Sequence, residues 1–168
     1  MPSPQTQPTP SPTSQDRHAR SLQLAAEAYL AHSHPRAPLR LERLSLHGVV
    51  YRSAPDPAAL RLNRALAEDV VLVALAAGEA AALSGSAPLA EGRDARMLLA
   101  CALSDPDEHS TLDAYLSVLR GRARARLRRA WSEVEVLAAG LREHGELDAD
   151  QVAHRVACAQ GIRVSLLN

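Results

Sequence analysis

The segment STLDAYLSVLRGRARARLRRAWSEVEVLAAGLREH, residues 110–144, decides the fold. Its apolar residues recur at alternating spacings of three and four, which places them on one side of a helix that must face a core. These residues are Leu112, Leu116, Leu119, Ala123, Leu127, Ala130, Val134, Leu137 and Leu141. Ser110 followed by Asp113 is typical of a capping box, and Gly145 supplies the left-handed residue that commonly ends a helix. We therefore expect one long helix or two nearly collinear helices.

The composition restricts the class of protein. A chain of 168 residues can bury one sizeable core, and nineteen basic residues cancel nineteen acidic ones, which argues against general attraction to nucleic acid or to an acidic membrane. No apolar run reaches the roughly twenty residues that a membrane-spanning helix needs, and no signal peptide opens the chain. Cys101 and Cys158 lie in helical patterns, which predicts buried free thiols. We expect a cytoplasmic protein without membrane contact.

The order of elements predicts a mainly α fold. Proline-rich residues 1–14 cannot bury enough apolar surface to fold, so we expect a disordered tail followed by a single helical domain over residues 15–168. We expect helices over 15–33 and 57–83, the second beginning at Asp56-Pro57, then a helix that follows Asp94 and a last helix ended by Gly161. We also expect a hairpin over 39–52 and an acidic loop over 104–109. This is a compact helical domain of about five helices with one short β-hairpin.

Three segments resemble the helical peptidase domain of the FtsH-type zinc metallopeptidases, and more closely the small stand-alone bacterial proteins that lack its ATPase. AAGEAA at residues 76–81 with Gly85 resembles the small-residue helix of the family. Asp94 resembles the aspartate that completes the zinc site. The last two helices are matched by Trp131, Val134, Leu137, Ala138, Leu141, Gly145, Glu146, Leu147 and Val152. The resemblance implies a peptidase-like helical scaffold.

The catalytic motif of that family is missing. Its H-E-x-x-H places two imidazoles on one helix face to hold zinc, and the glutamate takes a proton from the zinc-bound water. The aligned positions here are Ala26, Glu27 and Leu30, so both histidine positions are aliphatic. We interpret these positions and Asp94 as vestigial, with Glu27 an ordinary exposed helix residue and Asp94 a helix N-cap. The sequence thus predicts a pseudo-metallopeptidase without metal or cofactor.

A rearranged zinc site is the first alternative. His32 and His34 follow the first helix and His47 stands on the expected hairpin, so the three could gather near Asp94 and restore a zinc-dependent peptidase with other ligands. Two of the histidines fall in a proline-flanked loop, whereas zinc ligands are usually fixed by rigid elements. Solvated loop histidines are the simpler interpretation.

The arginines between Arg120 and Arg129 suggest a second alternative, nucleic-acid binding. The interaction candidates are Arg122, Arg124, Arg126 and Arg129. The zero net charge and the scarcity of aromatic residues for base stacking argue against it. We favour a solvated face whose arginines pair with nearby carboxylates, with an acidic protein partner as another use of them. The expected carboxylates are Asp105, Asp107, Glu108, Glu133 and Glu135.

These features together favour a binding protein over an enzyme. We expect a catalytically inactive peptidase-like helical domain that acts as a protein-binding or self-assembly module, with an unknown protein or a second copy as its partner. The small-residue helix and the amphipathic stripes motivate a homo-oligomer. Trp131, the only tryptophan, is the expected core anchor of the last helices.

Overall fold

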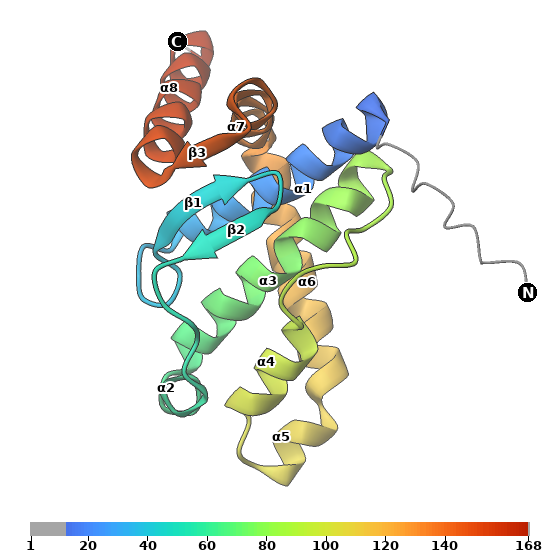
Figure 1. Cartoon of the computed structure of the whole chain (residues 1–168). Helices are drawn as coiled ribbons and strands as arrows, with labels where there is room; N and C mark the ends of the chain where they lie inside the picture. Colours follow the sequence, from blue (N-terminus) through green and yellow to red (C-terminus); the bar gives the residue numbers. More distant parts are fainter. Residues whose placement is uncertain (1–12, 168) are drawn as a thin grey trace, which may run out of the picture.

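The computed structural model describes residues 13–167 and confirms the mainly α fold (Figure 1). The helices are α1 (Ser14–Ser33), α2 (Pro57–Leu62), α3 (Arg64–Ser84), α4 (Ala95–Ala102), α5 (Pro106–Ser110), α6 (Leu112–Arg129), α7 (Trp131–His144) and α8 (Ala149–Leu167). The strands are β1 (Leu41–Ser45), β2 (Gly48–Tyr51) and β3 (Glu146–Asp148). The predicted tail lies outside the described residues except at its end, where Thr13 caps α1 by accepting a hydrogen bond from the Asp16 amide at 3.1 Å.

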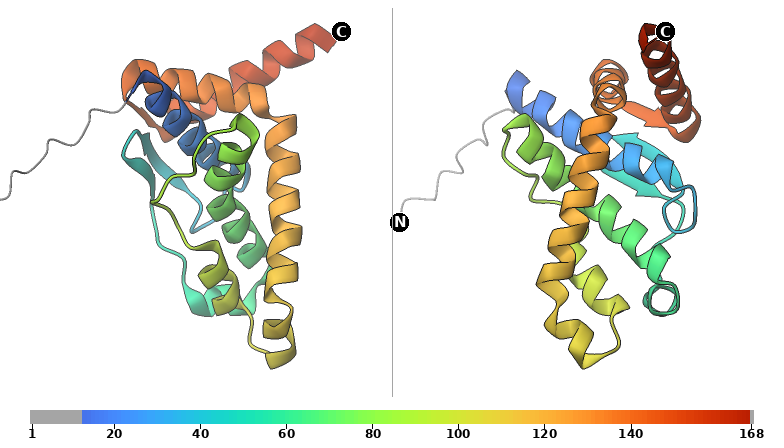
Figure 2. Two further views of the ribbon diagram at one scale, coloured as in Figure 1. Left: turned by 90° about the vertical axis from the view of Figure 1, so that its right-hand side faces the viewer. Right: turned by 180° about the vertical axis from the view of Figure 1, so that it is seen from behind.

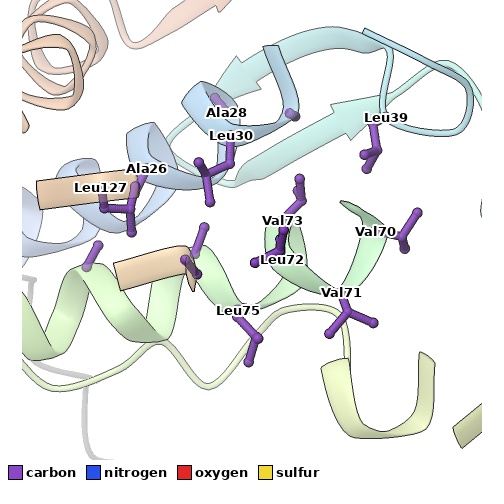
Figure 3. Packing of buried hydrophobic residues seen from close by; sticks show 14 of the residues in the cluster. Ala26, Ala28, Leu30, Leu39, Val70, Val71, Leu72, Val73, Leu75 and Leu127 are labelled. Carbon is purple, nitrogen blue, oxygen red and sulfur yellow. The ribbon is translucent and has the colours of Figure 1, made fainter. Parts of the chain in front are cut away.

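The central helix is α3, which packs against α1, α4 and α6. Its middle turns are apolar on nearly every side, as the sequence predicts, and Val70, Val73 and Ala76 have no exposed surface. Figure 3 shows Leu72 and Val73 of α3 in one buried cluster with Leu30 of α1. One part of the buried face of α1 is therefore covered by α3, and α7 also packs against this helix.

The apolar stripe of residues 110–144 is buried along its whole length, but the helix that carries it is not straight. The chain turns sharply at Ala130, so that α6 and α7 meet at a steep angle (Figure 2). The prediction of collinear helices is wrong because the first half of the stripe packs on α3 and the second half on α1. Trp131, at the turn, is only partly buried and is not the deep anchor expected from the sequence.

Several helices begin or end at residues other than those predicted from the sequence. Ser110 ends α5, a short helix within the predicted acidic loop, and Thr111 precedes α6 without a side-chain cap. Asn63 divides the predicted helix over 57–83 and caps α3 by accepting from the Leu66 amide at 3.0 Å. The last helix does not stop at Gly161. Cys101 and Cys158 are free as predicted, but neither is buried: Cys101 is partly exposed and Cys158 is exposed.

A three-stranded antiparallel sheet in the order β2-β1-β3 replaces the expected lone hairpin. The third strand was missed because it is only three residues long. It pairs Leu147 with Leu44, and both side chains are fully buried. Since β1 lies between its two neighbours, β2 forms one edge of the sheet.

No helix among residues 13–167 is both long and apolar enough to cross a membrane.

Candidate binding site between the first helix and an edge strand

A pocket of about 580 Å³ lies between α1, β2 and the loop of residues 85–94. Helix α1 contributes side chains one turn apart, the strand contributes its full length, and the loop closes the remaining side. The lining residues are Arg20, Leu24, Glu27, His47, Gly48, Val49, Val50, Tyr51, Arg52, Ser53, Ala54, Leu89, Glu91, Gly92 and Arg93. We call this the edge pocket.

Glu27 lines the edge pocket and contacts Tyr51, which is covered in turn by Arg93. The Tyr51 hydroxyl donates a hydrogen bond to Glu27 Oε1 at 2.7 Å, and the Arg93 guanidinium lies over the Tyr51 ring, 4.0 Å from its centroid. Such stacking of a guanidinium on an aromatic face is attractive. The prediction that Glu27 is an ordinary exposed helix residue is therefore wrong.

Burial has the largest effect on the ionisation of this pair. It raises the pKa of Glu27, while the hydrogen bond from Tyr51 and the positive charge of Arg93 act in the opposite direction. Burial and the neighbouring Glu27 carboxylate also raise the pKa of Tyr51 far above its usual value. The phenol thus keeps its proton and remains a hydrogen-bond donor to Glu27.

The rim of the edge pocket is tied together by Arg20. Its Nε donates to the Leu46 carbonyl at 2.5 Å, and its Nη2 pairs with the exposed Glu91 carboxylate at 3.1 Å. One arginine of α1 thereby joins the hairpin turn to the loop. Deeper in the site, Nη1 of Arg93 is buried and has no hydrogen-bond partner in the described structure.

The strand presents unpaired backbone to the pocket. The Arg52 amide donates to the Arg40 carbonyl at 3.0 Å, and Val50 lies opposite Arg43 in the register with β1. Because hydrogen bonds to one neighbour alternate along an antiparallel strand, the peptide groups of Val49 and Tyr51 point away from β1. These groups form an open edge that another extended chain could pair with.

The structure separates the positions that resemble the H-E-x-x-H segment. Ala26 and Leu30 have no exposed surface and belong to the core, whereas Glu27 lines the edge pocket. The carboxylate of Asp94 accepts from the Met97 amide at 3.0 Å and caps α4 as predicted, outside the lining of the pocket. Glu27 is thus the only one of the four that faces this site.

The three histidines considered as metal ligands lie in different surroundings. His47 lines the edge pocket, and His32 lies in another pocket beside Pro35. The Nδ1 atom of His34 is 2.7 Å from the Leu30 carbonyl, and its Nε2 atom is 3.4 Å from Asp69. Within residues 13–167, no three histidine, cysteine, aspartate or glutamate side chains form a group that could hold a metal ion.

The arginines of α6 divide into two groups. Arg122 pairs with Glu68 at 2.7 Å, and Arg124 pairs with the buried Glu79 at 2.7 Å. Both carboxylates belong to α3. These arginines do pair with carboxylates, as predicted, but not with the ones that were expected. Arg126 instead contacts His34. Arg129 is exposed. Of the four predicted interaction residues, Arg122 and Arg124 are therefore already paired with carboxylates of the same chain.

Sequence reasoning missed Tyr51 and Arg93. Tyr51 stands in the predicted hairpin and Arg93 in the predicted loop, and neither belongs to a spaced motif. Only the fold brings both to Glu27, so no signal in the sequence could have identified the group.

The chain matches no protein-family model and no curated protein sequence. The resemblance to the FtsH-type peptidases therefore remains a prediction, and the geometry of the edge pocket carries the functional argument.

Proposed function

We propose that this chain is a protein-binding module on a peptidase-like helical scaffold, without hydrolytic activity, and that it holds an extended segment of a partner protein along β2. The observation that carries the proposal is that β2 lies at the edge of its sheet and lines the edge pocket along its full length. An extended peptide can add to such an edge as a further strand, since main-chain hydrogen bonds supply affinity and the adjoining pocket supplies specificity.

The character of the pocket supports a partner segment with acidic character. The pocket is lined by three positively charged side chains, Arg20, Arg52 and Arg93. It is also lined by two carboxylates, those of Glu27 and Glu91. Glu27 already accepts from Tyr51, and Arg20 already pairs with Glu91. Arg52 is exposed, and Arg93 is partly buried and lines the pocket. A carboxylate on the bound segment would complement these two arginines.

The surroundings of Glu27 support binding without cleavage. A glutamate that acts as a general base must reach the proton of a reacting water, but this carboxylate is engaged by the Tyr51 hydroxyl. Its neighbours Ala26 and Leu30 are packed in the core. We further propose that the protein works in the cytoplasm and that a second copy is one of the partners that can occupy the edge.

Peptide selection tests the proposal. Random twelve-residue peptides are displayed on phage and selected on the immobilised full chain, and the enriched peptide is then made in two N-methylated forms. One form blocks every second amide, and the other blocks the remaining amides. Strand addition predicts that only one form loses binding in fluorescence anisotropy, because only one set of amides faces β2. Equal loss in both forms, or no enriched peptide, would contradict the proposal.

A digestion assay separates this function from the zinc-peptidase alternative. The protein is purified without a histidine tag, analysed for metal and incubated with casein. We expect intact casein. Stoichiometric zinc together with cleavage that a chelator abolishes would overturn the proposed lack of activity.

A further inference from the structure

A second pocket lies where α6 turns into α7, on the far side of α1 from β2. It has a volume of about 400 Å³, and its lining includes His34 at the end of α1, Arg126 and Arg129 in the last turn of α6, Ala130 at the turn and Arg163 of α8. Figure 2 shows α6, α7 and α8 around this corner. We call it the corner pocket.

The arginines of the corner pocket lack the carboxylate partners that the preceding arginines of α6 have. Two and four residues before Arg126 on α6, Arg124 and Arg122 each meet a carboxylate of α3 at 2.7 Å. Within residues 13–167, Arg126 contacts the His34 ring, and neither Arg126 nor Arg129 forms an ion pair with a carboxylate. Two guanidiniums one turn apart thus face the same pocket without a matching negative charge.

The carboxylates near this corner are already engaged. Glu133 is fully buried; its Oε2 accepts a hydrogen bond from Ser132 at 2.7 Å, and its Oε1 lies 3.0 Å from Nη1 of Arg163 as an ion pair without accepting a hydrogen bond from any described residue. Asp69 lies 3.4 Å from both His34 Nε2 and Arg36 Nε. Each carboxylate therefore has a cation of its own, and the charges of Arg126 and Arg129 remain in excess.

The backbone adds to the positive potential. Ala130 is the N-cap of α7 and lines the pocket, but its side chain cannot cap the first amides of the helix. The N-terminus of the fourteen-residue helix α7 lies at the turn, where Glu133 in the first turn offsets part of its positive potential. The carbonyl end of α6 lies at the same place, and Arg163 reduces its negative potential by donating to the Arg129 carbonyl at 2.8 Å.

We infer that the corner pocket binds the phosphate group of a small organic phosphate. Guanidinium groups bind phosphate through several parallel charge-assisted hydrogen bonds, and a phosphate can accept from two arginines at once. A volume of about 400 Å³ suits a phosphate group with a small substituent. This site is separate from the edge pocket and does not depend on the function proposed there.

Calorimetric titration of the full chain with inorganic pyrophosphate at low ionic strength tests the inference. Arg126→Gln and Arg129→Gln should each weaken binding by about tenfold, since each removes a hydrogen bond to a charged group. Arg128→Gln is the matched control, because Arg128 is exposed on the same turn and does not line the pocket. It should change the affinity by less than about twofold. Arg163 is left unchanged because it also holds Glu133.

Other outcomes would overturn the inference. Equal weakening by all three substitutions would indicate general attraction to an arginine-rich helix. Undetectable binding of both pyrophosphate and inorganic phosphate at millimolar concentration would exclude the site. A single-stranded oligonucleotide that binds more tightly than pyrophosphate, and loses affinity equally in Arg128→Gln, would indicate a nucleic-acid surface instead. Circular dichroism of each variant confirms that it is folded.

Discussion

The two faces of α1 differ in what determines them. The core face carries Ala26 and Leu30, which pack on α3, and its character follows directly from the apolar periodicity of the helix. The pocket face carries Arg20 and Glu27, whose roles depend on partners from the hairpin and from the loop before α4. One helix thus has a face that local sequence defines and a face that tertiary contacts define. The following substitutions test this difference.

The largest effect is expected on the core face. Leu30→Ala should lower the free energy of unfolding by about 2–5 kcal/mol, because it removes a fully buried side chain and leaves a cavity. Urea denaturation measures the loss. Leu62→Ala is the control, since that side chain is 89% exposed and should change stability by less than about 0.5 kcal/mol. Equal effects of the two substitutions would mean that α1 does not pack on α3.

A smaller effect is expected for Tyr51→Phe on the pocket face. The substitution removes the hydrogen bond to Glu27 and should cost about 1–2 kcal/mol, because a partly buried carboxylate loses its donor. A double-mutant cycle with Glu27→Ala, which removes the acceptor, measures the coupling by urea denaturation. Strictly additive effects of the two substitutions would contradict a contact between these side chains.

The pH dependence of Glu27→Gln sharpens the comparison. Burial raises the native pKa of Glu27 above its ordinary value of 4.5, so folding favours the protonated form. Stability linked to this group is fully present below pH 4.5 and is lost as the pH rises through the native pKa. The Gln variant should therefore melt at a slightly higher temperature than the wild type at neutral pH, and the difference should vanish in acid. A variant that melts lower at neutral pH would show that the site favours the charged carboxylate.

The smallest effect is expected at the rim. Glu91→Gln breaks the pair with Arg20, but the Glu91 side chain is 75% exposed and solvent screens the interaction. Thermal unfolding should place the change within about 0.5 kcal/mol. A larger loss would mean that the loop of residues 85–94 contributes to stability through this contact.

The parts of the fold that sequence could predict are those that depend on local periodicity. The stripe from Leu112 to Leu141 is buried as expected, and Asp56 and Asp94 cap the helices that follow them. The turn at Ala130 could not be predicted, because an unbroken stripe is compatible with two helices that pack on different partners. The third strand escaped detection because so short a strand carries almost no periodic signal.

Less of the candidate site than of the fold could be predicted from the sequence. Glu27 was identified through a resemblance, but its environment was misjudged because Tyr51 lies 24 residues away in the chain. A spacing of that length has no local signature. The unbalanced arginines of α6 have the same cause, since the helical period places Arg124 and Arg126 on different sides of the helix but does not say which side chains lie beside each.

Hydrogen exchange at β2 is the most direct test of the account. The exchange rates of single amides are measured by NMR in the free chain and with the selected peptide bound. Strand addition predicts that the amides of Val49 and Tyr51, which point away from β1, become protected, while that of Val50, which faces β1, changes little. Peptide binding that leaves Val49 and Tyr51 unprotected would contradict the proposed recognition along this edge.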